Sequence, residues 1–132
     1  MKEAIIAQVI VVFCKAIKKF AKKNGYEEAD TSLMLRLNDS KTLDILICHL
    51  HNPVKPTTAK DVMGMTLSFS GLGGMIVQYI EQILLGFRAS CGTEAVDILV
   101  YLDRNDDENI NLFLYADSKF VRQFYLEEVL TI

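Results

Sequence analysis

The chain has 132 residues, of which 51% are hydrophobic and 23% are charged, and its formal net charge is −3. This length predicts a single domain over residues 1–132, and the composition excludes a disordered chain. The mild acidity disfavours a non-specific nucleic-acid binder, which is usually basic, so we expect no nucleic-acid partner.

Three widely spaced cysteines, Cys14, Cys48 and Cys91, are typical of a reduced cytoplasmic protein rather than a disulfide-linked secreted one. The uncharged run over residues 62–80 contains glycines and polar side chains, so we predict no membrane span. Residues 1–66 hold ten Lys and Arg and seven Asp and Glu, whereas residues 67–132 hold four and ten. Such an asymmetry can orient a partner.

The first predicted element is an amphipathic helix over residues 2–24, with apolar residues such as Ile6, Ile10 and Phe13 at helical spacing. Asn24-Gly25 is a typical helix end. The last turns carry a basic patch that could meet an anionic surface, formed by Lys15, Lys18, Lys19, Lys22 and Lys23.

Alternating apolar residues then predict strands over residues 33–37 and 42–50. Residues 51–60 hold both prolines and no periodicity, so we expect a loop. Alternation resumes over residues 63–70, which predicts a third strand. Gly71-Leu72-Gly73-Gly74 breaks the chain before a second apolar helix over residues 75–90, with Gly92 as its end.

Two further alternating runs predict strands over residues 96–103 and 110–115. Asp117 or Ser118 is a candidate cap of a final helix that carries Phe120, Val121, Phe124 and Leu126, although residues 124–132 could instead be extended. The sequence therefore predicts an α+β domain. We expect a predominantly antiparallel sheet of about five strands, helices on one face, and the order α-β-β-β-α-β-β-α.

No catalytic, cofactor or metal motif stands out. Cys48, His49 and His51 are the closest to a metal cluster, but strand alternation puts the two histidines on one face and Cys48 on the other, so we predict no metal site. Gly71, Gly73 and Gly74 precede a helix, whose free N–H groups could receive an anion.

The second face of the predicted sheet is unusually apolar for a solvated surface. We expect this face to be covered in part by the final helix, by a second copy of the chain or by a client segment. It presents Met34, Leu46, Leu99, Tyr101, Phe113 and Tyr115, which are the candidate partner-binding residues.

This element order, size and acidity resemble the dimeric chaperones of type III secretion systems. The resemblance implies a homodimer that binds extended protein segments and has no cofactor or catalytic residue. Our leading hypothesis is a non-enzymatic protein-binding module, a chaperone or adaptor. The competing interpretation is a small-molecule or anion binder, an enzyme included, that uses the glycine turn at residues 71–74.

Overall fold

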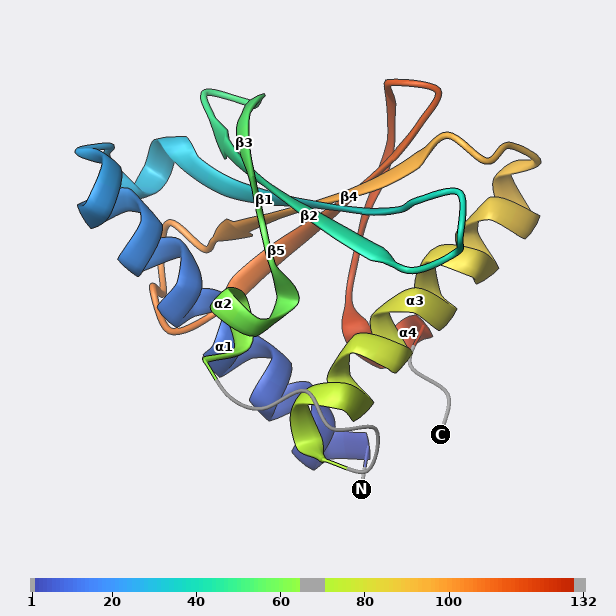
Figure 1. Ribbon diagram of the computed structural model, residues 1–132, viewed down its shortest axis with the longest axis horizontal. Coiled ribbons are helices and arrows are strands. Elements are labelled where there is room, and N and C mark those ends of the chain that lie inside the picture. Colours follow the sequence, from blue (N-terminus) through green and yellow to red (C-terminus); the bar gives the residue numbers. More distant parts are fainter. Residues whose placement is uncertain (1, 65–70, 130–132) are drawn as a thin grey trace.

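A computed structural model describes residues 2–64 and 71–129 of the chain. Two long helices, α1 (Lys2–Asn24) and α3 (Leu72–Cys91), diverge in a V below one face of an antiparallel sheet (Figure 1). The strand order is β3-β2-β1-β4-β5-β6. The strands are β1 (Thr31–Leu37), β2 (Leu43–His49), β3 (Asn52–Thr57), β4 (Val96–Leu102), β5 (Ile110–Ala116) and β6 (Lys119–Phe124).

Three short helices connect these elements: the 3-10 helix η1 (Glu28–Asp30), α2 (Ala59–Met63) and α4 (Leu126–Val129). Within residues 2–64 and 71–129, no helix combines the length and the apolar character that a membrane crossing needs. The α+β class and the antiparallel sheet are confirmed, but the sheet has six strands rather than five.

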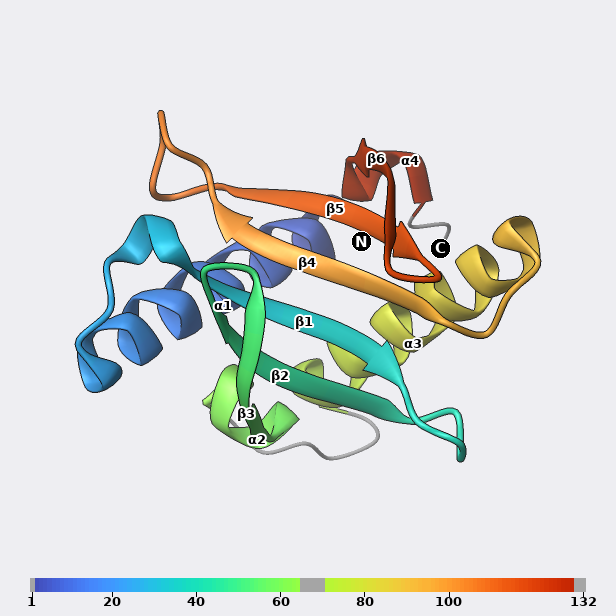
Figure 2. The ribbon, with the colours of Figure 1, turned by 90° about the horizontal axis from the view of Figure 1, so that it is seen from above.

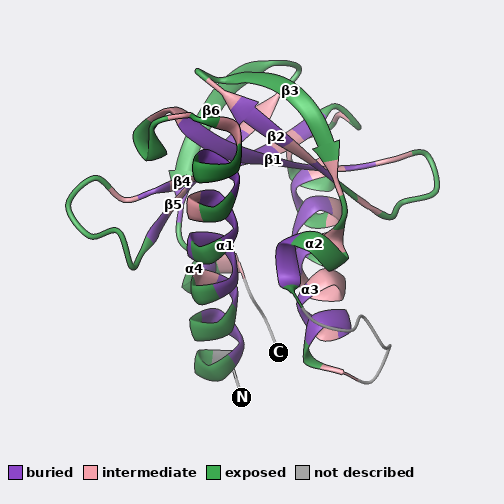
Figure 3. Ribbon diagram, turned by 60° about the vertical axis from the view of Figure 1, so that its left-hand side comes forward, coloured by how far each residue is buried: buried purple, intermediate pink, exposed green. Residues whose placement is uncertain are grey.

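The main core lies between the two long helices and the lower face of the sheet. It buries the apolar stripe of α1, including Phe13 and Ile17, against alternate strand residues such as Leu33 and Val100. Figure 3 shows this buried layer where the helices meet the sheet. The alternation in the four central strands therefore has the predicted cause: odd residues of β1 and even residues of β4 and β5 point to the helices.

Both long helices end where the sequence predicts. Gly25 and Gly92 follow them with φ of 71° and 67°, a left-handed conformation that glycine adopts without strain. Tyr26 N donates to Ala21 O at 2.9 Å, which satisfies one of the last carbonyls of α1. The helix α3 begins earlier than expected, because Leu72, Gly73 and Gly74 form its first turn.

The predicted loop over residues 51–60 is wrong, because residues 52–57 form β3. Pro53 and Pro56 are tolerated there, since an edge strand pairs along only one side. Met63 was expected to begin a third strand but instead ends α2, which Thr58 caps by accepting from Asp61 N at 3.1 Å. The rest of that predicted strand, residues 65–70, lies outside the described residues.

The predicted final helix that carries Phe120, Val121, Phe124 and Leu126 is also wrong, because Lys119–Phe124 is a strand. Asp117 and Ser118 form a tight turn with φ of 51° and 64°, and the chain returns as β6. Only Leu126–Val129 is helical, and Leu126 packs in the main core.

The chain repeats one structural unit twice. In each unit a long helix precedes strands of 7, 7 and 6 residues, and a short helix follows them. Each outer hairpin has a register shift, between Ile47 and Cys48 in one unit and between Leu114 and Tyr115 in the other. Because β1 and β4 pair antiparallel, an approximate twofold axis through the sheet relates the units, as the view from above shows (Figure 2).

Candidate functional site

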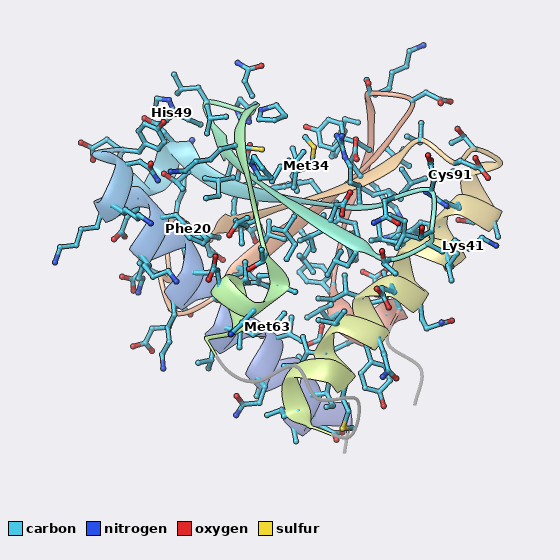
Figure 4. The ribbon with its side chains drawn as sticks, in the orientation of Figure 1. Phe20, Met34, Lys41, His49, Met63 and Cys91 are labelled. Atoms are coloured by element: carbon cyan, nitrogen blue, oxygen red, sulfur yellow. The ribbon has the colours of Figure 1, made fainter. Side chains whose placement is uncertain are left out.

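The face of the sheet away from the long helices, here called the outer face, carries a second apolar cluster. Met34, Cys48 and Leu99 are buried in it. Figure 4 shows Met34 on this side of the sheet and Phe20 on the helix side. The six predicted partner-binding residues all belong to the cluster, with Leu46, Tyr101, Phe113 and Tyr115 half-buried around its centre.

The edge strands, rather than the final helix, flank this face. Both β3 and the β5–β6 turn rise above the plane of the sheet (Figure 1). Their register shifts are bulges, which strengthen local twist and bend a strand. The strand β6 crosses the sheet edge, because Phe120 at its start contacts Phe113 and Tyr115 on the outer face, whereas Phe124 at its end packs against Phe87 in the main core.

Between these flanks lies a groove of about 500 Å³, here called the outer groove. This volume is in the range of small-ligand and side-chain pockets. Its lining residues are Ala29, Asp30, Leu50, His51, Tyr101, Leu102, Asp103, Arg104, Asn105, Asn111, Phe113, Tyr115 and Phe120.

Four aromatic rings form a continuous chain along the outer groove. The centroid of Phe113 lies 5.7 Å from that of Tyr101 and 6.3 Å from that of Phe120. The Phe120 ring lies 5.8 Å from Tyr115, and all three distances are within the range that aromatic pairs prefer. Phe120 joins Phe113 to Tyr115 and is nevertheless 58% exposed, so the chain of rings includes a large apolar surface open to solvent.

The turn between β2 and β3 forms the opposite rim. Leu50 and His51 have φ of 50° and 70°, and Leu50 N donates to Asp30 O at 2.9 Å. His51 Nδ1 and the Tyr101 hydroxyl form a hydrogen bond across the groove wall. Burial raises the pKa of Tyr101, so the phenol keeps its proton well above neutral pH.

Sequence reasoning missed Leu50, His51 and Phe120 as groove residues. Leu50 was assigned to the end of the strand over residues 42–50, His51 to a loop and Phe120 to a helix. Leu50 had a signal, because alternation puts it on the same face of that strand as Leu46. His51 and Phe120 had none, because β3 and β6 are exposed along almost their whole length and show no apolar alternation.

The two histidines do not share a face, which corrects the strand-alternation argument. His49 ends β2 and stacks on Tyr26 with centroids 3.9 Å apart, whereas the turn carries His51 to the outer groove. The left-handed turn residues reverse the chain after His49, so alternation does not continue through position 51. Within the part of the chain that the structure describes, no three His, Cys, Asp or Glu residues are grouped to hold a metal.

The basic patch is used partly within the molecule. Lys18 Nζ lies 3.2 Å from Asp107 Oδ2, and hydrogen bonding to Asp107 raises the pKa of Lys18. Lys19 Nζ donates to Asp61 O at 2.9 Å. Lys15, Lys22 and Lys23 are exposed on α1, on the far side of the sheet from the outer groove.

The candidate anion site occupies the start of α3. Gly71 precedes the helix, and Gly73 and Gly74 are buried in its first turn. Residues 65–70, which precede Gly71, lie outside the described part of the chain, so anion binding at this turn stays a prediction.

Comparison with protein-family models, with curated proteins and with solved structures gives no match for the chain.

Proposed function

We propose that the protein is a non-enzymatic binding module that holds an extended segment of another polypeptide in the outer groove. The observation that carries this proposal is the chain of four aromatic rings that includes the exposed Phe120. Aromatic side chains in partly desolvated pockets dominate the energetics of protein interfaces. The 54% exposed Leu50 supplies a second apolar contact on the opposite rim.

The repeated architecture supports a binding role for these rings. Phe113 and Tyr115 occupy the positions that Leu46 and Cys48 hold in the first unit. Phe120 follows its turn as Pro53 follows the turn of the first unit. The same backbone therefore forms twice, and among the residues that the structure describes it is the second unit that places Phe and Tyr rings on the outer face. Folding alone does not require them.

A strained turn beside the groove also supports a binding role for this face. A left-handed backbone costs an ordinary L-residue about 1–2 kcal/mol, and such strain is concentrated at functional sites. Leu50 combines this conformation with an exposed apolar side chain at the rim. Neither feature contributes to stability.

The expected likeness to the dimeric chaperones of type III secretion systems belongs to the same proposal, and so does a homodimer. The structure keeps the expected long helix before each group of strands, although the second group has three strands rather than the two on which the likeness was based. The competing hypothesis of a small-molecule or anion binder uses the glycine turn before α3 and the polar row Thr66, Ser68 and Ser70, and that row lies outside the described residues.

Selection from a phage-displayed library of random peptides tests the proposed function. We expect the selected peptides to bind the wild-type protein and the Val121→Ser variant equally. Phe120→Ser should weaken their binding by at least about tenfold, because it removes the exposed ring that joins Phe113 to Tyr115. Val121 is a matched control, since it is 45% exposed on the same strand and does not line the groove.

Thermal unfolding of both variants shows whether each retains the fold. If no peptide is enriched, or if folded Phe120→Ser binds the selected peptides as tightly as folded Val121→Ser, the outer groove is not the binding site.

A further inference from the structure

One end of the outer groove is acidic. Asp30 ends η1 and is half-buried, and its carboxylate forms no hydrogen bond or ion pair with any residue that the structure describes. Its backbone is held in place, because Asp30 O accepts from Leu50 N and Asp30 N donates to Glu27 O at 3.1 Å. A carboxylate in a groove, with its oxygens not engaged by a neighbouring side chain, can accept charge-assisted hydrogen bonds from a cationic ligand.

Asp103 lies at the same end, where β4 passes into the β4–β5 loop, and its Oδ1 accepts from Asn105 N at 2.9 Å. Arg104 also lines the groove, but its side chain is exposed. The lining thus has two carboxylates and one guanidinium, and it is net negative. Tyr101 lines the groove beside them, and aromatic rings attract cations.

The distance from this acidic end to the apolar end is set by strand geometry. Asp103, Tyr101 and Leu99 follow each other along the outer side of β4. Leu99 pairs with Phe113, and Asp97 pairs with Tyr115. A strand rises about 3.4 Å per residue. Measured along β4 from Asp103, the position level with Phe113 is therefore about 14 Å away, and the position level with Tyr115 is about 20 Å away.

An extended peptide presents every second side chain to the same surface, at intervals of about 7 Å. From these observations we infer that the partner segment carries a Lys or Arg side chain at the acidic end of the outer groove. Apolar side chains two and four positions along the segment then lie over the rings. This inference rests on the proposed function and adds the chemistry of the partner.

The test compares two synthetic peptides that differ by one charge. Acetyl-Gly-Arg-Thr-Leu-Thr-Leu-Gly-amide carries the inferred pattern, and its partner has the neutral isostere citrulline in place of Arg. Both are also made with the order of residues reversed, because the groove does not fix the chain direction. Binding is measured by calorimetry with the full-length protein. We expect the better-oriented Arg peptide to bind about tenfold more tightly than its citrulline partner.

Variants of the acidic end complete the test. Asp30→Asn should remove the preference for Arg over citrulline, whereas the control Asp39→Asn, which makes the same change in net charge on the exposed β1–β2 loop, should leave it intact. Arg104→Ala removes a like charge from the lining and should tighten only the Arg peptide, by several-fold. A merely structural role of Asp30 predicts neither pattern.

Equal binding of the Arg and citrulline peptides, or a preference that survives Asp30→Asn, overturns the inference and leaves the proposed function standing. Failure of all four peptides to bind also overturns it. The proposed function is judged separately, by the phage selection and the Phe120→Ser variant, since that selection presumes no charge in the peptide.

Discussion

Phe120 and Val121 are neighbours on β6 with different surroundings. The Phe120 ring contacts Phe113 and Tyr115 on the outer face, whereas Val121 is exposed and lines no part of the groove. Val121 is the extra residue of the β6 bulge, because Tyr115 pairs with Phe120 and Leu114 with Arg122, so it is unpaired and turns away from the site that Phe120 joins. A helical assignment of this segment hides that difference, because helical neighbours are separated by about 100° rather than 180°.

The three cysteines differ in their surroundings and should differ in reactivity. Cys14 and Cys48 are buried, and burial raises the pKa of both thiols, so the reactive thiolate is scarce at pH 8. Cys91 is half-buried at the end of α3 (Figure 4). We expect a disulfide reagent to modify Cys91 first in the native protein, and the other two only after denaturation, as followed by mass spectrometry.

The Cys91→Ser variant is the control and should take up no reagent in the native state during the same interval. Native modification of Cys14 or Cys48 at the rate of Cys91 would contradict the buried positions that the structure gives them.

At the scale of elements, the two outer hairpins have the same shape and different turn residues. Asp117 and Ser118 occupy one turn, and Leu50 and His51 occupy the other, all with positive φ. Two-residue hairpins favour Asn, Asp and Gly at such positions, because these residues adopt the left-handed conformation at the least cost. Leu50 does not follow this preference, and for this reason the sequence did not predict the hairpin.

Replacing Leu50 by Asn should therefore stabilise the protein. We expect the free energy of unfolding, measured by urea denaturation, to rise by about 1 kcal/mol, since the turn loses its strain and Leu50 buries little surface. The same variant should bind groove peptides more weakly, because it lacks the apolar rim. The matched control is Val54→Asn on β3, which is 47% exposed with no left-handed backbone and should bring no gain. Equal stability of wild type and Leu50→Asn would show that the turn is not strained.

Edge strands are the elements that sequence patterns reveal least. The central strands alternate because one face meets the long helices, and this alternation was predicted for β1, β2, β4 and β5. In contrast, β3 is exposed at all positions but its last, which is half-buried, and β6 at all but Phe124. Their existence depends on hydrogen bonding to β2 and β5, which leaves no periodic signal in the side chains.

At the scale of the whole molecule, part of the charge asymmetry between the two halves is used in a contact within the chain. The basic end of α1 belongs to the first unit and the acidic β4–β5 loop to the second, and the ion pair between Lys18 and Asp107 connects them. Part of the asymmetry that the sequence suggests for a partner is therefore satisfied within one chain.

The two edges of the sheet differ in a way that bears on self-association. Pro53, Lys55 and Pro56 protect the β3 edge, because proline offers no N–H and lysine resists desolvation. The β6 edge also has charged residues, Lys119 and Arg122, and a bulge like that of β3, but it has no proline. We expect the proposed homodimer to form by pairing of two β6 edges, so light scattering should give twice the mass of the 14.9 kDa chain.

In this arrangement Val121→Lys should yield a monomer, while Val54→Lys on the protected edge should leave the dimer intact. A wild-type protein that stays monomeric at high concentration, or a dimer that survives Val121→Lys, would rule out this mode of assembly.

The sequence by itself determined the two long helices with their glycine ends, the four central strands and the division of the sheet into two faces. These features follow from local periodicity and from residues such as Gly25 and Gly92, whose effect is confined to their own neighbourhood. Only the tertiary structure decided that the edge strands rise beside the outer face and enclose a groove. That outcome depends on long-range strand pairing, on two bulges and on the left-handed turn that brings Leu50 and His51 opposite the rings of the second unit.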